Sequence, residues 1–457
     1  MKDRVHLIGI GGAGISAIAR VLLERGVDVT GSDREESEYS RALQVAGVTV
    51  FYGHAAANVS GAGTVVASSA IPDDNIELKA AADAGIPVFR RPAYLKQIMK
   101  DHRVIAVAGT HGKTTTSGMA AWILASAGRD PSFIVGGMLP NFGTNAHAGK
   151  GADFVIEADE YAQTFLALEP SIALITNVEH DHPDCYPTLA DCLESFNQFA
   201  GRVKDVLIVC ADNPGSAGLR AGAVRRVTYG EDPAAAWCLR NVATNAFHGM
   251  DADVIHKGET IATLQTRISG RHNLMNALGA LVIAIEAGIE IGPACEAIRI
   301  YQGPARRFQI LGEAGGVTVI DDYAHHPTEI RATLSAARER YPDAVIWAVF
   351  QPHTYSRTRT LLRELAGSFE GVDHVLVTRI FAAREMPDGI TTGAQVAAEL
   401  AHVDAVYTAE LDDALQMLQA GVLPGDVVIT LSAGDANRVG MDLLAWLEER
   451  RGDHPNG

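Results

Sequence analysis

Residues 104–116 read VIAVAGTHGKTTT, and this stretch determines the fold of the middle of the chain. A run of small and β-branched apolar residues stops abruptly at Gly109, and helix-compatible sequence follows Lys113, so the pattern predicts a strand, a glycine-rich turn and a helix. Glycines let backbone N–H groups converge on phosphate oxygens, and the first turn of a helix adds unpaired donors and a positive dipole end. We therefore predict a phosphate-binding loop formed by Gly109, Thr110, His111, Gly112, Lys113, Thr114 and Thr115.

Two side chains of this loop have specific expected roles. Lys113 supplies positive charge for the β- and γ-phosphates of a nucleoside triphosphate, and the Thr114 hydroxyl is placed to bind Mg²⁺. The loop is shorter than the usual phosphate loop, because Val107 stands where the first glycine normally lies and Gly109 comes only three residues before Gly112. A chance glycine-rich turn after a buried strand is the alternative interpretation.

Length, composition and charge narrow the class of protein. A chain of 457 residues is too long for one ordinary core and suggests about three domains. No apolar run reaches the roughly 18 residues that a membrane span needs. The net charge of −17 argues against a nucleic-acid partner, which would need a basic face. Five cysteines without a CxxC pair, and a functional-looking loop directly after the start, predict a cytoplasmic protein with no membrane partner.

Residues 1–98 are predicted to form a Rossmann-like N-terminal domain. GIGGAG at residues 9–14 follows a strand-like run and has the GxGxxG spacing. Asp33 lies at the end of the next predicted strand, near the position of an acid that binds a ribose. On motif logic alone this is a dinucleotide-binding fingerprint, so an NAD-binding dehydrogenase or a nucleotide-sensing module is an alternative function.

The rest of the chain is predicted to form two further α/β domains. Residues 99–312 contain the phosphate loop, an antiparallel β patch at 225–268 and a long apolar helix at 270–288, which describes a central P-loop ATPase-like domain. Residues 301–313 are interpreted as a linker because they combine Gly, Pro and two arginines. Residues 313–457 alternate strands and helices, which predicts a Rossmann-like C-terminal domain.

Polar clusters follow three predicted strands of these domains. Because open α/β sheets bind ligands at the carboxyl ends of their strands, the clusters should gather around the phosphate loop. Glu157 and His182 are candidate ligands of Mg²⁺, with a helix-terminal acid as the alternative for Glu157. A zinc site is a weaker alternative, because no CxxC or HxxxH spacing completes it. The zinc candidates would be His180, His182, Asp184 and Cys185.

Three further groups have both a functional and a structural interpretation. His272 and Asn276 share a helix face if the helix has begun by residue 272, and Asn side chains suit an adenine edge, but Asn273 could instead be an N-cap. The arginine pairs 306–307 and 357–359 match phosphate and carboxylate geometry, although lone arginines are often solvated. His325 and His326 precede Pro327 in a βα loop, where the structural alternative is that a histidine only caps the end of the strand.

Taken together, these motifs resemble the Mur ligase family of ATP-dependent amide ligases along nearly the whole chain. The matching segments, in the family's order, are HLIGIGGAGISAIA, GSD, SSAI, AGTHGKTTT, EADE, TNVEHDHPD, GRHNLMNALGA, ARRF, DDYAHHPTEI, FQPHTYSRTR and LSAGDAN. The resemblance implies a ligase of peptidoglycan synthesis that uses ATP and Mg²⁺. It implies UDP-N-acetylmuramate and L-alanine as substrates, joined through an acyl phosphate, and a monomer or homodimer as the assembly.

The same resemblance implies a role for each candidate residue. The first glycine-rich turn would hold the diphosphate of the UDP-sugar instead of NAD, with binding residues Gly11, Gly12, Ala13, Gly14, Asp33 and Ser69. ATP would lie on the phosphate loop, with His272 and Asn276 at the adenine and Asp322 at the ribose. Tyr323, His325 and Arg357 would bind L-alanine, and Thr114, Glu157 and His182 would bind the metal ions. The catalytic group would be Lys113, Glu157, His182, Arg307 and His325.

The chain also departs from the family pattern. Thr354 stands where Gram-negative relatives often carry arginine, which leaves Arg357 to bind the amino-acid carboxylate. EADEYAQTF replaces the commoner EADESDASF, and no lysine matches the carbamylated lysine of several relatives. The nearest alternative is a ligase of the same fold that recycles a whole tripeptide onto the same sugar. A P-loop ATPase that couples hydrolysis to motion is a third possibility.

Overall fold

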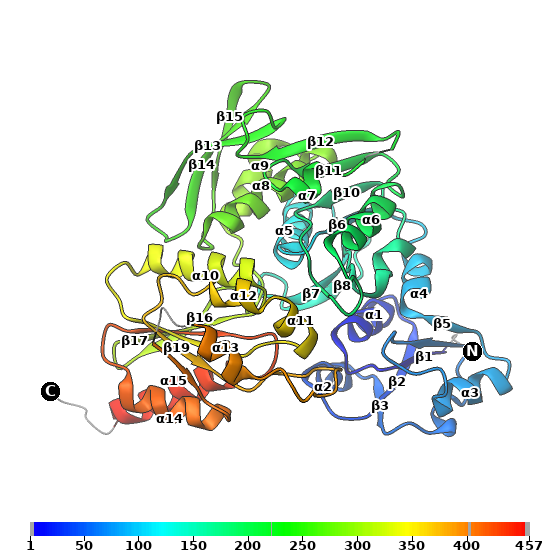
Figure 1. The fold of residues 1–457 in the computed structure, drawn as a ribbon. Helices are drawn as coiled ribbons and strands as arrows, with labels where there is room; N and C mark the ends of the chain where they lie inside the picture. Colours follow the sequence, from blue (N-terminus) through cyan, green and yellow to red (C-terminus); the bar gives the residue numbers. More distant parts are fainter. Residues whose placement is uncertain (1–3, 221, 401–403, 453–457) are drawn as a thin grey trace.

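The chain folds into three α/β domains, each built on its own sheet (Figure 1). The computed structural model describes residues 4–220, 222–400 and 404–452. The N-terminal, central and C-terminal domains contain sheets of five, ten and six strands. In Figure 1 the central domain lies at the top, the N-terminal domain at the lower right and the C-terminal domain at the lower left. The predicted class, α/β with three domains, is confirmed.

The N-terminal sheet is parallel throughout and has the order β3-β2-β1-β4-β5. Because the order reverses at β1, a ligand crevice is expected at the carboxyl ends of β1 and β4. The strands are β1 (Arg4–Ile8), β2 (Asp28–Asp33), β3 (Thr49–Tyr52), β4 (Thr64–Ala67) and β5 (Val88–Arg90). The helices are α1 (Ala13–Glu24), α2 (Glu38–Val45), α3 (Ile76–Asp83) and α4 (Arg91–Ile98), with a 3-10 turn η1 (Ala56–Val59).

The central sheet has the order β15-β14-β13-β12-β11-β10-β6-β9-β7-β8. Its strands are β6 (Arg103–Ala108), β7 (Ser132–Leu139), β8 (Thr144–His147), β9 (Asp153–Glu157), β10 (Ile172–Ile175), β11 (Val206–Cys210), β12 (Arg225–Gly230), β13 (Trp237–Thr244), β14 (Met250–His256) and β15 (Glu259–Gln265). Its helical segments are α5 (Lys113–Ser126), η2 (Tyr161–Ala167), α6 (Leu189–Ala200), α7 (Pro214–Ala217), α8 (Arg271–Glu286) and α9 (Ile291–Arg299). The predicted antiparallel patch is confirmed for β13–β15, whereas β12 pairs in parallel with β11 and β13.

Strand β6 lies at the centre of this arrangement, between β9 and β10, and pairs in parallel with both. Its residues are buried on both faces, since Ile105 and Val107 pack with α5 and α8 while Ala106 and Ala108 belong to the opposite cluster. A continuous apolar run is what burial on both faces requires. The loops after β6, β9 and β10 therefore open at one edge, where they form the site.

The C-terminal sheet has the order β16-β17-β21-β18-β19-β20, with only β16 antiparallel to its neighbour. Its strands are β16 (Gln309–Ala314), β17 (Val317–Asp322), β18 (Ile346–Phe350), β19 (His374–Val377), β20 (Asp404–Tyr407) and β21 (Val427–Leu431). Its helices are α10 (Pro327–Arg340), α11 (Tyr355–Thr360), α12 (Leu362–Ala366), α13 (Gly393–Glu399), α14 (Leu411–Gly421) and α15 (Asn437–Gly452). None of the helices in the described part of the chain has the length and apolarity needed to cross a bilayer.

The predicted linker at residues 301–313 is wrong in its second half. Residues 309–313 belong to β16, which pairs with β17 from Gln309 opposite Asp321 to Ala314 opposite Val317. The pairing partner lies across a two-glycine turn at Gly315 and Gly316, both with positive φ. This hairpin places the strand in the C-terminal sheet, so the connection between domains is shorter than the composition suggested.

A buried carboxylate organises the polar interior of the N-terminal domain. Glu77 is fully buried, and its oxygens accept hydrogen bonds from Ser32 Oγ at 2.5 Å and Asn58 Nδ2 at 2.6 Å. The His6 ring lies 3.4 Å away. Burial alone would raise the pKa of Glu77, but His6, Ser32 and Asn58 outweigh it and lower the pKa to about 2. The ionised form is therefore part of the folded state.

Glu77→Gln is expected to change the pH dependence of stability. A depressed folded-state pKa adds stability above the unfolded value of about 4.5, and this is lost as pH falls through about 2. The variant should be less stable by about 3 kcal/mol at neutral pH, and the gap should close between about pH 4.5 and 2. Hydrogen exchange in β1 and β2 at several pH values measures it, with the exposed Asp74→Asn as control. A gap that is independent of pH would contradict the assigned ionisation.

Candidate active site

The phosphate loop has the predicted strand-turn-helix structure. Strand β6 ends at Ala108 and helix α5 begins at Lys113. Gly109 and Gly112 have φ of 132° and 81°, and a Cβ at either position would collide with Thr176 or Asn276. Both glycines are therefore required by positive φ and by close approach. The N-cap of α5 has no side-chain hydrogen bond, which leaves the first backbone N–H groups of the helix free for an anion.

Lys113 is held at the mouth of the loop by oxygen atoms. Its Nζ donates to the carbonyl oxygens of Gly109 at 2.6 Å and Thr110 at 3.0 Å, and it pairs with Glu160 Oε1 at 2.9 Å. Burial would lower the pKa of Lys113, but Glu160 and other nearby carboxylates outweigh it and raise the pKa. Burial raises the pKa of Glu160 to about 7, against the opposing effect of Lys113. Lys113 is thus a charged group near neutral pH.

Thr114 and Glu157 lie together beside the loop. The Thr114 hydroxyl donates to Glu157 Oε1 at 3.0 Å, and the Gly136 N–H donates to Glu157 Oε2 at 2.6 Å. Glu157 is the last residue of strand β9, so the alternative of a helix-terminal acid is wrong. A carboxylate and a hydroxyl next to a phosphate loop match the oxygen ligands of Mg²⁺.

His182 lies close to a carboxylate that sequence reasoning did not assign to the site. Its Nε2 is 3.7 Å from Glu160 Oε1 and 3.7 Å from Asp181 Oδ2. Burial lowers the pKa of His182, which favours the neutral imidazole. Glu160 was visible in the sequence only as the final acid of EADE, and nothing in that run distinguishes it from its neighbours. Its importance follows from burial beside Lys113.

A cavity of about 280 Å³ lies between the central domain and helix α10 of the C-terminal domain. It is lined by predicted nucleotide-binding residues from four separate segments: His111, Gly112, Thr114, Thr115, His272, Asn276, Arg307 and Asp322. Burial, assisted by Arg307, lowers the pKa of His272 to about 4, so this imidazole is neutral. Helix α8 begins at Arg271 with Gly270 as N-cap, so Asn273 is inside the helix and the interpretation of Asn273 as the cap is wrong.

Several cavity residues were missed by sequence reasoning. Asn177, Asp212, Asn213 and Glu329 supply polar groups, and Tyr229 supplies an apolar wall. Asp212 and Asn213 follow a buried strand, so the repeated pattern of a strand ending in polar residues was a usable signal. Tyr229 lies within β12 and carried no such signal, because only the packing of α8 over that strand brings it to the cavity.

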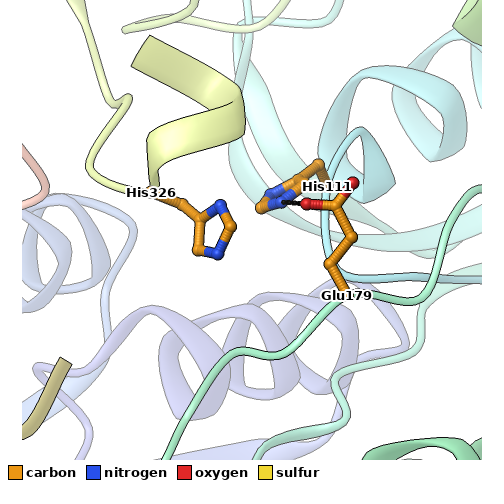
Figure 2. Close-up of side chains that lie close together, drawn as sticks. All are labelled: His111, Glu179 and His326. Carbon is orange, nitrogen blue, oxygen red and sulfur yellow. Dashed lines mark ion pairs between the residues drawn. The ribbon is translucent and has the colours of Figure 1, made fainter. Parts of the chain in front are cut away.

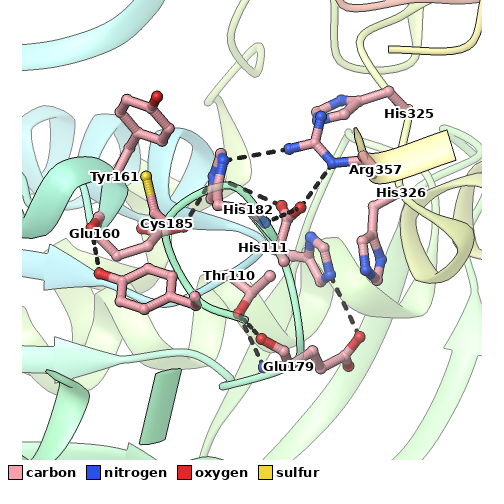
Figure 3. A network of polar contacts seen from close by, with 12 residues as sticks. Thr110, His111, Glu160, Tyr161, Glu179, His182, Cys185, His325, His326 and Arg357 are labelled. Carbon is pink, nitrogen blue, oxygen red and sulfur yellow. Dashed lines mark hydrogen bonds and ion pairs between the residues drawn. The ribbon is translucent and has the colours of Figure 1, made fainter. Parts of the chain in front are cut away.

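A buried ion pair connects the central and C-terminal domains next to this cavity (Figure 3). Arg357 Nε lies 2.7 Å from Asp181 Oδ1, and both side chains are at least nine-tenths buried. Arg357 also donates to the His353 carbonyl oxygen at 2.8 Å and reaches His182 Nδ1 at 3.4 Å. Arg357 overcomes the effect of burial and holds the pKa of Asp181 well below its usual range.

Of the other arginines, some lie at the site and some make structural contacts. Arg307 pairs with Glu329 at 3.3 Å and lies over the Tyr323 ring, and the His325 ring contacts the same tyrosine. Arg306 also lies over the Tyr323 ring, but it pairs with Asp321 at 2.9 Å and donates to backbone carbonyls, which is a structural role. The exposed Arg359 pairs with Asp388 at 2.7 Å.

The predicted zinc set is not gathered in the described part of the chain. His180 Nε2 contacts the Tyr186 carbonyl oxygen at 2.9 Å, and Asp184 accepts from the Tyr161 hydroxyl at 2.9 Å. His326 is the N-cap of helix α10, which begins at Pro327, and its ring accepts the Thr328 N–H at 3.3 Å, so it caps this helix and not the end of the preceding strand. In the ranges that the structure describes, the group with metal-binding spacing is His111, Glu179 and His326 (Figure 2).

The second predicted site lies at the carboxyl ends of β1 and β4. Asp33 Oδ2 accepts the Gly11 N–H at 2.8 Å, and α1 begins directly after Gly12, which has no side-chain cap. Ala13 and Gly14 form the start of that helix, so this turn offers free N–H groups. Ser69 is exposed in the loop after β4.

Arg91 was missed by the sequence analysis and lies between the two sites. A Cβ on Gly14 would come within 2.8 Å of its guanidinium, and its Nη1 is 4.0 Å from Asp159 of the central domain. Its Nε is buried with no hydrogen-bond partner among the residues described. This guanidinium is therefore a candidate ligand for an anion at the first glycine-rich turn.

The fold and these sites define an enzyme of three α/β domains that carries a phosphate loop facing a nucleotide-sized cavity. Family models match along the chain: "Mur ligase family, catalytic domain" at residues 4–103, "Mur ligase middle domain" at 107–284 and "Mur ligase, glutamate ligase domain" at 306–434. The chain belongs to the Mur ligase family.

Individual relatives match over nearly the full length. The chain is 44% identical to UDP-N-acetylmuramate–L-alanine ligase of Salinibacter ruber, over 98% of this chain and 96% of that protein. It is 42% identical to the protein of the same name from Mycolicibacterium gilvum, over 98% and 97% of the two chains. The solved structure of UDP-N-acetylmuramate-alanine ligase MurC from Thermotoga maritima superposes with a TM-score of 0.84 at 27% identity, over 98% and 99%. A murein peptide ligase from Psychrobacter arcticus gives 0.72 at 26% identity, over 97% and 98%.

Gly112→Ala is expected to weaken nucleotide binding by more than about tenfold, because an unfavourable φ is combined with a collision with Asn276. Gly128→Ala is the matched control, since Gly128 has φ 73° but no heavy atom within 4 Å of the added Cβ. The control should lose about 1 kcal/mol of stability and keep its affinity. Titration with a fluorescent ATP analogue measures both variants. Equal affinities would show that the contact between Gly112 and Asn276 does not shape the site.

Proposed function

We propose that this protein joins L-alanine to UDP-N-acetylmuramate at the expense of ATP. The observation that carries the proposal is the phosphate loop beside the nucleotide cavity, where Thr114 lines the cavity and donates to Glu157, and Lys113 precedes it in the chain. This placement occurs in a chain whose full-length relatives are named UDP-N-acetylmuramate–L-alanine ligase. A Mur ligase from Thermotoga maritima has been solved in complex with ADP, which supports the use of ATP.

The proposed chemistry has two steps. The lactyl carboxylate of the sugar attacks the γ-phosphorus of ATP, which gives an acyl phosphate and ADP. The amine of L-alanine then attacks the acyl carbon, and inorganic phosphate leaves from a tetrahedral intermediate. Neither step needs a covalent bond to the protein, so positioning and charge carry the reaction.

This chain's residues fit these requirements. The glycine-rich loop N–H groups and Lys113 would hold the β- and γ-phosphates, and Arg307 would approach from the C-terminal domain. Mg²⁺ bound at Thr114 and Glu157, with a further ion near His182, would neutralise charge on the triphosphate. His272 and Asn276 would contact the adenine and Asp322 the ribose. Burial raises the pKa of Asp322 to about 6, although Arg307 opposes this effect.

The two other substrates would occupy the neighbouring domains. The UDP-sugar is proposed to bind at Gly11, Gly12, Ala13, Gly14, Asp33 and Ser69. Arg91 is proposed as a further ligand of its diphosphate. Tyr323, His325 and Arg357 are proposed to form the alanine side of the site. Because Arg357 is already paired with Asp181, it would have to share its charge between that carboxylate and the substrate.

Other parts of the proposal concern the whole molecule. We propose the predicted domain boundary after residue 98, and we move the second boundary from 312/313 to 308/309 because β16 (Gln309–Ala314) belongs to the C-terminal sheet. We also propose a cytoplasmic location and a monomer or homodimer. A net charge of −17 supports the absence of a nucleic-acid partner. A tripeptide-recycling ligase is the second candidate function, because murein peptide ligases share the fold at up to 28% identity.

Phosphate release from ATP and Mg²⁺ in the presence of UDP-N-acetylmuramate tests the function. L-alanine is expected to stimulate release, and the tripeptide L-Ala-γ-D-Glu-meso-diaminopimelate is not. Release driven only by the tripeptide would identify the recycling ligase. Release that is independent of the sugar would overturn the proposed substrates.

Lys113→Ala is expected to lower the rate of phosphate release by at least about 10²–10³-fold, because a charge aimed at the phosphates is removed. Binding of UDP-N-acetylmuramate should be unchanged in calorimetry, since its proposed site lies in the N-terminal domain. Lys100→Ala removes an exposed lysine and serves as the control. Loss of UDP-sugar binding in Lys113→Ala would contradict the assignment of the two sites.

A further inference from the structure

Three side chains from two domains meet beside the nucleotide cavity. His111 belongs to the phosphate loop, Glu179 follows β10, and His326 precedes helix α10 of the C-terminal domain. One possible ligand atom of each lies within 4.8 Å of the others. Figure 2 shows the two imidazole rings facing each other with the carboxylate beside them, and the ring centroids are 4.5 Å apart. Two imidazoles and a carboxylate are a donor set that suits Zn²⁺.

The His111 side chain supplies an unpartnered atom that is directed into this group. Its Nε2 is buried and has no hydrogen-bond partner within the described ranges, and Glu179 Oε2 lies 3.4 Å from it. A buried ring nitrogen without a hydrogen bond is costly to the folded protein. A metal ion between Nε2 and the carboxylate would give this nitrogen a partner and use the remaining acceptor capacity of Glu179.

Each of the three side chains is also held by a neighbouring group. His111 Nδ1 lies 3.3 Å from Glu329 Oε1, Glu179 Oε2 accepts from the Thr328 hydroxyl at 2.6 Å, and His326 Nε2 is 3.3 Å from the His180 carbonyl oxygen. When His326 Nε2 carries the proton and donates, His326 Nδ1 keeps a lone pair that a metal ion can use. In the metal-free protein this lone pair accepts the Thr328 N–H at 3.3 Å. A ring nitrogen that donates to a carboxylate or carbonyl, with the other nitrogen free, is the usual arrangement of metal-bound histidine.

We propose that His111, Glu179 and His326 bind one Zn²⁺ ion that links the central and C-terminal domains. Three protein ligands leave a fourth tetrahedral position for water. The site shares no residue with the proposed Mg²⁺ ligands Thr114, Glu157 and His182, whose set is dominated by hard oxygen atoms. Zn²⁺ would bind to the nucleotide-free protein, because His111 and Glu179 also line the nucleotide cavity.

Cobalt spectroscopy and calorimetry test the proposal. Co²⁺ and Zn²⁺ are added to the full-length, nucleotide-free protein in excess Mg²⁺. One equivalent of Co²⁺ should give the intense visible absorption of a tetrahedral site, and Zn²⁺ should abolish it. Calorimetry should show that one equivalent of Zn²⁺ binds per chain. Absence of binding, or a weak octahedral spectrum, would overturn the proposal.

Variants locate the ion. Glu179→Gln, which preserves shape, and His326→Ala should each weaken Zn²⁺ binding by more than about 100-fold, and Glu329→Gln by about 10–100-fold. His147→Ala is the matched control, because His147 also contacts two carboxylates, Glu24 and Asp130, but is 40% exposed. It should bind Zn²⁺ like the unaltered protein. Unchanged affinity in Glu179→Gln and His326→Ala, or loss in His147→Ala, would place the ion elsewhere and overturn the proposal.

Discussion

The buried ion pair between Asp181 and Arg357 is the interaction on which the arrangement of the site depends. It joins the loop after β10 in the central domain to helix α11 in the C-terminal domain. Removing one partner of such a pair leaves an uncompensated buried charge, which typically costs about 3–5 kcal/mol. Further contacts between these domains include Thr328 with Glu179, His326 with the His180 carbonyl oxygen and His111 with Glu329. The nucleotide cavity and the three-residue metal group exist only where these two domains meet.

Charge compensation explains how so many ionisable groups are buried together. Lys113, Arg307 and Arg357 each have a carboxylate within 3.3 Å, from Glu160, Glu329 and Asp181. When no phosphate or carboxylate ligand is bound, each acid supplies the negative charge that its buried cation needs in a region of low dielectric constant. The pKa of Glu160 is raised to about 7, so its protonation near neutral pH costs little. Lys113 can therefore exchange this partner for a phosphate oxygen without a large loss of free energy.

Agreement between the sequence patterns and the structure is best where the signal is local. The strand, turn and helix at residues 104–126 follow from the apolar run and the glycines, and the shared face of His272 and Asn276 follows from helix periodicity. The sequence predictions fail where contacts between distant segments determine the structure. Residues 309–313 are a strand because β17 pairs with them, and Glu160 and Tyr229 belong to the site because of what packs against them. Arg91 was unremarkable in sequence, and only the approach of Gly14 and Asp159 gives it a possible role.

The sequence by itself determined the α/β class, the two glycine-rich turns, the family and several of the residues that surround the nucleotide cavity. These features depend on short-range rules: periodic burial, the conformational freedom of glycine and the placement of polar residues at strand ends. Only the tertiary structure decided which acid accompanies Lys113, which arginines face the site, and that His111, Glu179 and His326 form one group. Those properties depend on burial and on distances between segments from different domains, and neither quantity is encoded in the spacing of residues along the chain.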